Sequence, residues 1–211
     1  MLFELSLRYM LTGRGVRHGN NGYTPHAYPA YVIAVASVEA FLNETMISPL
    51  SQMGFGATPL DLFDSEEVER LDLLLKIQLL PQIHVGRTMP RNTQPFQDFQ
   101  MLVRLRNEIV HYKMAGLPLG LLRDLEQRGI ALPKPEKTQP ADYLAMGKIS
   151  CTEGIRWAHN TACRVVHRLV ELAPPDRSEN MAYLASGFVE ITTADVEAAL
   201  AAMSKDDGKG A

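Results

Sequence analysis

Residues 96–114 read FQDFQMLVRLRNEIVHYKM, and their pattern decides the fold class. At 100° of turn per residue, the apolar side chains of this stretch gather on one broad face of a helix. These apolar residues are Phe99, Leu102, Val103, Leu105, Ile109 and Val110. The opposite face carries Arg104, Asn107, Glu108 and His111. A two-sided pattern of this length predicts an α-helix that buries one face in a core.

Three other stretches repeat this periodicity, at about 30–47, 65–80 and 154–172. We expect Ser65 to cap the second of these helices and Pro81 to stop it. The last stretch has an apolar face made of Ala158, Ala162, Val165, Val166, Leu169 and Leu172. Four amphipathic helices separated by turn residues predict an all-α protein, built as a four-helix bundle with up-and-down topology.

The remaining stretches divide the chain into three parts. Residues 1–24 are rich in glycine and asparagine and predict an irregular N-terminal arm or loop. Residues 25–174 hold the bundle, with a short additional helix at 119–129. Residues 175–211 predict a C-terminal extension, in which residues 188–191 favour a short strand, followed by a short helix and a flexible tail.

Composition excludes several classes of protein. The chain has 46% apolar and 21% charged residues, as ordinary globular proteins do. It holds no run of about 18 apolar residues, as a membrane span requires, and its N-terminus lacks the basic start of a secretory signal. We therefore expect a cytoplasmic protein that does not span a membrane. Two cysteines and six scattered histidines, none in a metal-binding spacing, predict no metal site and no cofactor.

The charge is distributed unevenly along the chain. The formal net charge of −3 argues against a protein whose whole surface binds nucleic acid. Residues 87–113 differ from the rest, since they contain five basic and only two acidic side chains. This local excess either forms a basic patch or is an uneven scatter of solvated charges.

Arg106 does not fit the pattern of the helix at 96–114. It falls near the middle of the apolar arc, where a guanidinium group needs a partner. Glu39 has a similar position in the first helix, on the apolar side between Val32 and Met46. A carboxylate and a guanidinium on two facing apolar surfaces favour an ion pair. The sequence therefore predicts a contact between Glu39 and Arg106.

The segment LVRLRNEIVHYK resembles the R-x4-H signature of HEPN domains, helical bundles found in prokaryotic toxins and defence proteins. Three further segments are similar to the usual layout of this family. SVEAFLNE resembles its first helix, KIQLLPQI the approach to its motif helix, and IRWAHNTACRVVHRLVEL its closing helix. Together the resemblance covers about residues 30–173, most of the chain.

This resemblance implies a metal-independent endoribonuclease with a toxin or defence role. It assigns catalytic roles to Arg106, Asn107 and His111, and contacts with the RNA to Arg104 and Lys113. A base would take the proton of a ribose 2′-OH, which attacks the neighbouring phosphorus and leaves a 2′,3′-cyclic phosphate. A histidine can accept or donate such a proton near neutral pH. An arginine can hold a phosphate with its planar fork.

Helix geometry adds a constraint on this site. Residues five positions apart lie about 140° apart around a helix, so Arg106 and His111 do not share a face. Two motif helices that meet at a two-fold axis would bring an arginine and a histidine from each copy to one cleft. The family resemblance likewise implies a homodimer with a shared site.

The resemblance also implies a protein partner, since some HEPN toxins pair with nucleotidyltransferase antitoxins that adenylylate a tyrosine in the motif R-x4-H-x-Y. Here Tyr112 follows His111 directly, one position earlier than in that motif. This departure argues against the same regulation through Tyr112. An antitoxin or another regulatory protein remains a predicted partner.

Other interpretations stay open for these residues. The chain can be a non-catalytic HEPN-like module that binds RNA or nucleotide or only dimerises, because a fold does not grant an activity. It can also be an accessory subunit whose segment after Pro175 docks a partner. Arg106 can serve only as an ion-pair partner, and Arg104 and Lys113 can be solvated charges. His159 and His167, two turns apart on one helix, are predicted surface residues.

Overall fold

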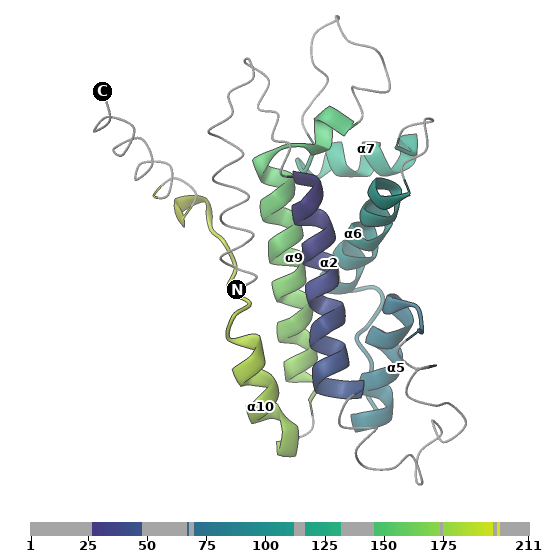
Figure 1. Ribbon diagram of the computed structural model, residues 1–211, viewed down its shortest axis with the longest axis vertical. Coiled ribbons are helices and arrows are strands. Elements are labelled where there is room, and N and C mark those ends of the chain that lie inside the picture. Colours follow the sequence, from purple (N-terminus) through teal and green to yellow (C-terminus); the bar gives the residue numbers. More distant parts are fainter. Residues whose placement is uncertain are drawn as a thin grey trace, which may run out of the picture. The chain divides into compact units, whose positions relative to one another are not determined.

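The computed structural model describes residues 27–47, 67, 70–111, 117–131, 146–173, 175–195 and 198. All its regular elements are helical (Figure 1). They are α2 (Ala27–Leu42), the π-helical turn η2 (Asn43–Ile47), α5 (Leu73–Val85), α6 (Gln94–Val110), α7 (Leu119–Gln127), α9 (Thr152–Glu171) and α10 (Pro175–Ala185). The described residues contain no strand, so the prediction of an all-α protein is confirmed for this part of the chain.

The chain forms two compact units, each gathered from separate stretches of sequence. Unit 1 takes its residues from 1–34, 104–160 and 189–211, and unit 2 from 35–103 and 161–188. Helices α2, α6 and α9 therefore contribute residues to both units. The units do not follow the predicted boundaries after residues 24 and 174, and that division stays a prediction. The predicted arm lies outside the described residues.

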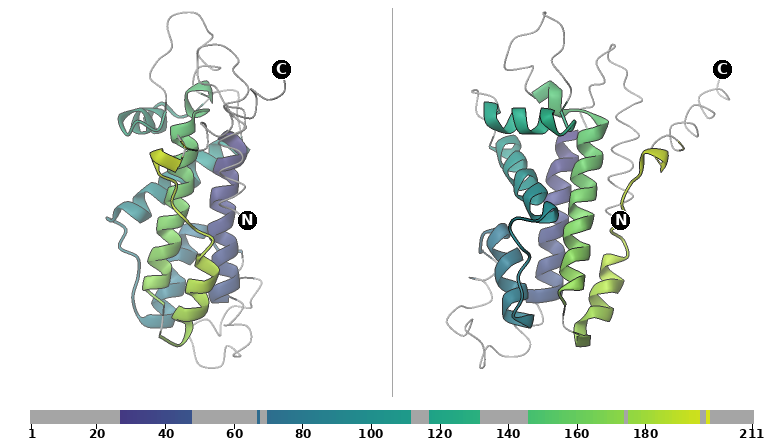
Figure 2. Two further views of the ribbon diagram at one scale, coloured as in Figure 1. Left: turned by 90° about the vertical axis from the view of Figure 1, so that its left-hand side faces the viewer. Right: turned by 180° about the vertical axis from the view of Figure 1, so that it is seen from behind.

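In unit 1, the first turns of α2 contact the segment that leads into α9. The Tyr28 hydroxyl donates to the Met146 carbonyl at 3.1 Å, and the Tyr31 hydroxyl donates to the Ile149 carbonyl at 2.5 Å. Complete burial raises the pKa of Tyr31 well above its usual value, so the hydroxyl keeps the proton that it donates. Helix α7 runs crosswise to these parts of α2 and α9 (Figure 2).

Gly154 allows the close approach of Tyr31 to the first turn of α9. A Cβ atom at position 154 would lie 2.0 Å from the Tyr31 hydroxyl oxygen and 3.2 Å from the Ile149 carbonyl oxygen. Only a residue without a Cβ atom leaves room for this hydroxyl. The glycine thus makes possible the hydrogen bond that joins α2 to the start of α9.

In unit 2, helix α5 begins and ends at other residues than the sequence suggests. The Asp72 side chain caps it, accepting hydrogen bonds from the Leu74 and Leu75 amides at 2.9 and 3.2 Å. The predicted stop at Pro81 is wrong, because this residue lies inside the helix. The helix continues for one more turn and ends at Gly86, whose φ of 67° is the left-handed conformation that favours glycine.

The other helices agree well with the pattern of the sequence. Helices α2 with η2, α7 and α9 cover nearly the predicted ranges, and helix α6 starts two residues before the predicted Phe96. The six residues of the predicted apolar face of α9 are all buried. In unit 2, the rings of Phe41 and Phe188 meet edge to face, with their centroids 5.8 Å apart. The apolar period therefore predicted the buried faces of these helices.

The predicted strand at 188–191 is wrong. These residues have an irregular backbone, and the polar groups of Ile191 are bonded to the side chain of Asn160 instead of to a neighbouring strand. Downstream, Thr192 and Asp195 form a reciprocal cap. The Thr192 amide donates to the Asp195 carboxylate at 2.7 Å, and the Asp195 amide donates to the Thr192 hydroxyl at 3.1 Å. This cap ends the irregular segment.

No helix within the described stretches is long and apolar enough to cross a membrane.

Candidate functional site

The last two turns of α6, in unit 1, present three polar side chains to solvent. Arg104, Asn107 and His111 are all exposed, and their spacing of three and four residues places them on one face of the helix. The His111 amide donates to the Asn107 carbonyl at 2.9 Å, so helical hydrogen bonding continues through His111. The predicted outward orientation of these three residues is confirmed. Their roles in binding or catalysis stay predictions.

Arg106 differs from its neighbours on α6. The residue is half-buried, and its buried Nε atom has no hydrogen-bond partner among the described residues. A buried N–H group of a charged side chain that has no acceptor carries a large desolvation cost. Among the residues that the structure describes, none therefore supplies an acceptor for this donor of the guanidinium group.

The apolar face of α6 is narrower than the sequence suggests. Phe99, Leu102, Val103 and Leu105 are buried, and Ile109 is half-buried. Val110 was predicted on the buried face but is 53% exposed, next to His111. The helix ends here, so its last turn has less of the unit to pack against. The result is an exposed apolar side chain directly beside the exposed imidazole.

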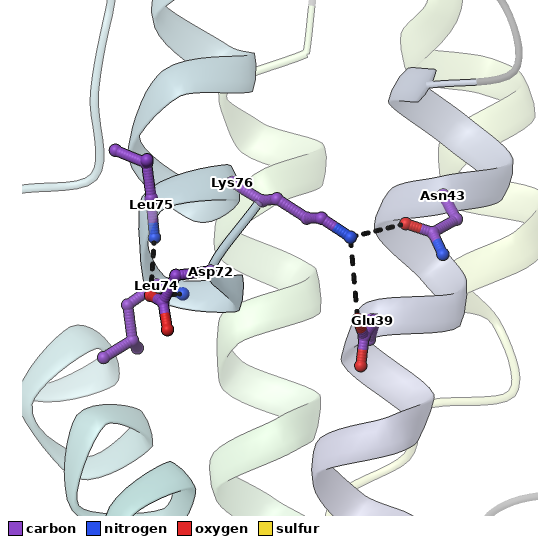
Figure 3. Close-up of polar contacts among 6 residues, drawn as sticks. All are labelled: Glu39, Asn43, Asp72, Leu74, Leu75 and Lys76. Carbon is purple, nitrogen blue, oxygen red and sulfur yellow. Dashed lines mark hydrogen bonds and ion pairs between the residues drawn. The ribbon is translucent and has the colours of Figure 1, made fainter. Parts of the chain in front are cut away.

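Glu39 has a different partner from the one predicted. In unit 2, its Oε1 atom lies 3.6 Å from the Nζ atom of Lys76, which also donates to the Oδ1 atom of Asn43 at 3.3 Å (Figure 3). Arg106 belongs to unit 1, so a contact between Glu39 and Arg106 is not part of either unit and stays a prediction. The Glu39 side chain is 42% exposed and can be solvated without Arg106.

Lys76 is the residue of this cluster that sequence reasoning missed. Its side chain is 0% exposed, although it carries an ammonium group. The signal was present in the sequence, since Lys76 stands inside the apolar run LLLKIQLL of helix α5. A lysine in such a run must either reach solvent or find an acceptor in the core. Here Asn43 and Glu39 supply the acceptors.

His159 is also placed differently from the prediction. It was expected at the surface but is only 5% exposed, and its Nε2 atom lies 2.8 Å from the Val189 carbonyl oxygen. Burial lowers the pKa of His159, while the hydrogen bond to Val189 and the nearby Glu190 act in the opposite direction. His167 is exposed, as predicted.

Two residues proposed from the sequence cannot be placed. Lys113, expected to contact RNA, and Tyr112, considered for regulation, lie outside the described residues. No group of three or more metal-binding side chains occurs in the part of the chain that the structure describes. The candidate site on the described part of α6 therefore consists of Arg104, Arg106, Asn107 and His111.

Comparison with known protein families gives no matching family model, and neither curated proteins nor solved structures match the chain. We therefore infer a function from the residues at the end of α6.

Proposed function

We propose that this chain is a metal-independent endoribonuclease of the HEPN type with a toxin or defence role, and that the end of α6 forms half of its active site. The observation that carries this proposal is the surroundings of Arg106. One of its donors is buried and has no partner in the described part of the chain, one position before the exposed Asn107 and about one and a half turns before the exposed His111. The resemblance further implies that the helices form a four-helix bundle.

Each of these groups suits a step of RNA cleavage by the 2′-OH. The exposed imidazole of His111 can take the 2′-proton or give a proton to the leaving 5′-oxygen. The guanidinium group of Arg106 can stabilise the negative charge that builds up on the phosphate. Asn107 can orient the substrate or the imidazole, and Arg104 can contact a neighbouring phosphate. Attack by the 2′-OH leaves a 2′,3′-cyclic phosphate and a 5′-OH, and consumes no water in this step.

The unpaired donor of Arg106 supports a phosphate as the missing acceptor. A guanidinium group that already had its full set of partners would have to lose them before it could bind RNA. Here the Nε–H group has no acceptor to give up among the described residues. A phosphate oxygen that gained access to it would satisfy a donor that is costly to leave unmade.

We further propose that the complete site forms in a homodimer. Arg106 and His111 point about 140° apart around α6, so one copy cannot readily bring both to the same phosphate. The exposed side chain of Val110, beside His111, is compatible with an interface in which a second copy of the chain covers it.

The direct test is incubation of purified protein with single-stranded RNA in EDTA. Wild type should cleave, while His111→Ala and Arg106→Ala should each lose about 100-fold or more of the rate. Arg168→Ala is a suitable control, because Arg168 pairs with Glu171 on α9 and belongs to unit 2, whereas the motif belongs to unit 1. Absence of cleavage of every RNA tested by wild type would contradict the proposal and favour the non-catalytic RNA-binding interpretation.

A mixing experiment tests the shared site separately. Each of the two inactive variants lacks a different group, so a mixed dimer still holds one Arg106 and one His111 at the shared cleft. We expect cleavage to reappear when His111→Ala and Arg106→Ala chains are mixed and allowed to exchange. Two inactive variants that stay inactive in a mixture with proven exchange would argue against a composite site.

A further inference from the structure

Residues 189–193 cross one face of α9 in unit 1, with an irregular backbone at 189–192 and the start of a helical turn at Thr193. Three polar side chains within about one turn of α9 hold them there, namely Arg156, His159 and Asn160. We refer to these three residues as the α9 clamp and to residues 189–193 as the strap. Two of the three clamp residues, His159 and Asn160, bind the backbone of the strap and not its side chains.

Asn160 makes a two-point contact with a single residue of the strap. Its Oδ1 atom accepts from the Ile191 amide at 2.8 Å, and its Nδ2 atom donates to the Ile191 carbonyl at 2.9 Å. Two facing residues of an antiparallel strand pair exchange the same two hydrogen bonds. The Asn160 amide therefore replaces a strand partner, and it recognises the main chain of an extended segment regardless of which side chain that residue carries.

The neighbouring clamp residues extend this recognition in both directions. The Val189 carbonyl can only accept, so the His159 Nε2 atom that lies 2.8 Å from it must carry the proton. Arg156 donates to the hydroxyl of Thr193. The clamp thus contacts the carbonyl of Val189, both backbone groups of Ile191 and the hydroxyl of Thr193, where the irregular segment passes into a helical turn.

The strap itself is held by few apolar contacts. Ile191 is 1% exposed and is its one buried side chain, while Val189 is 51% exposed and Thr192 and Thr193 are exposed. A segment with one apolar anchor and a handful of side-chain hydrogen bonds opens at low cost compared with a helix of the core. The same contacts can be made by any extended peptide with an aliphatic residue opposite Asn160.

We propose that the α9 clamp is a binding site for an extended peptide, that the strap occupies it in the free chain, and that a protein partner binds by displacing the strap. The partner presents an extended stretch with an aliphatic residue at the clamped position and a threonine or serine two positions later. This class of ligand follows from the buried Ile191 and the hydrogen-bonded Thr193. The proposal is independent of ribonuclease activity.

The probe for this site is a labelled synthetic peptide, GFVEITTAD, which copies residues 187–195. Its binding to the full-length chain is followed by fluorescence anisotropy. Ile191→Ser weakens the resident strap, so this variant should bind the peptide at least about tenfold more tightly than wild type. Adding Asn160→Ala to it should reduce the affinity about tenfold or more, because each lost hydrogen bond accounts for up to about a factor of ten. His167→Ala, an exposed position two turns further along α9, is the matched control.

A modified peptide separates main-chain recognition from simple apolar binding. N-methylation of the isoleucine nitrogen removes the N–H group from which Asn160 accepts a hydrogen bond, and it leaves the isoleucine side chain unchanged. We expect this peptide to bind at least about tenfold more weakly than the unmodified one. Equal binding of both peptides, or no binding of either to a helical Ile191→Ser chain, would overturn the proposal.

If Ile191→Ser does not fold, displacement of the strap can still be tested in the wild-type chain, by measuring hydrogen exchange of the Ile191 amide. The Ile191 amide should be protected, and an excess of the unlabelled peptide should accelerate its exchange by displacing the strap. Exchange that is unaffected by a large excess of peptide would contradict displacement.

Discussion

Two regions of unit 1 differ in how many of their polar groups have hydrogen-bond or ion-pair partners. They are the segment that leads into α9 and the end of α6. At the start of α9, residues 146–151 are bonded to several other segments of the unit. Tyr28 and Tyr31 donate to their carbonyls, Lys148 pairs with Glu126 of α7, and the Cys151 thiol donates to the Ile130 carbonyl at 3.0 Å. At the end of α6, by contrast, Arg104, Asn107 and His111 are exposed, and no described residue bonds to the Arg106 Nε atom.

This difference separates residues that maintain the fold from residues that are free to do chemistry. A buried polar group stabilises the folded state only when its partner is fixed, so the start of α9 should tolerate few changes. Exposed side chains at a helix end contribute little to stability, and substitutions there should cost little. Substitutions in the two regions should therefore change different measured quantities.

The largest effect on stability should come from Gly154→Ala. The added methyl group would overlap the Tyr31 hydroxyl, which must then move and lose its bond to the Ile149 carbonyl. We expect the free energy of unfolding to fall by about 2 to 4 kcal/mol, measured by urea denaturation. Gly120→Ala in α7 is the control, since no atom lies within 4 Å of its Cβ position. It should stabilise the chain by about 0.5 to 1 kcal/mol, and an equal loss in both variants would contradict the packing argument.

A smaller effect is expected from deleting the hydroxyl group of Tyr31 in α2, which bonds to the segment that leads into α9. Tyr31→Phe keeps the ring but removes the donor to the Ile149 carbonyl, which should cost about 1 to 2 kcal/mol. Asn107→Ala at the end of α6 should change the free energy of unfolding by less than about 0.5 kcal/mol. Similar losses in both variants, compared by thermal denaturation at one pH, would remove the distinction between the two regions.

The smallest effect concerns the pH dependence of stability. Burial lowers the pKa of His159 in the folded chain, so the unfolded chain binds a proton more readily below about pH 6.5. Stability should therefore be lost as the pH falls from about 6.5 through the folded-state pKa. His159→Gln keeps a donor for the Val189 carbonyl but cannot titrate, so it should flatten the fall in unfolding free energy between about pH 7.5 and 5.

The exposed His167 provides the control for this experiment through His167→Gln. If the unfolding free energy of His159→Gln falls as steeply with decreasing pH as that of wild type, other groups account for the loss of stability in acid.

Sequence periodicity predicted most of the helices, because burial of one helix face is a local pattern. The apolar face of α9 is a clear case, since all six predicted residues are buried. The limits of α5 were predicted poorly, because neither a cap nor a proline inside a helix changes the apolar period. Asp72 caps the helix and Pro81 lies inside it, and neither outcome can be read from the apolar period alone; the predicted cap Ser65 lies outside the described residues.

The partners of polar residues were much harder to predict than the helices. The ion pair between Glu39 and Lys76 was not predicted, because only packing decides which charged groups face each other. The predicted contact between Glu39 and Arg106 stays a prediction. His159 was missed for the same reason, because the carbonyl that it contacts lies 30 residues further along the chain. The outward orientation of Arg104, Asn107 and His111 followed from helix geometry and is correct.

The central claim is that the end of α6 is a catalytic surface and contributes little to the stability of the fold. It is tested most directly by measuring unfolding and RNA cleavage on the same preparation of His111→Ala. We expect a free energy of unfolding within about 0.5 kcal/mol of wild type and at least about a 100-fold loss of 2′,3′-cyclic phosphate product in EDTA. A variant that is equally stable and still produces the cyclic phosphate at the wild-type rate would contradict the claim.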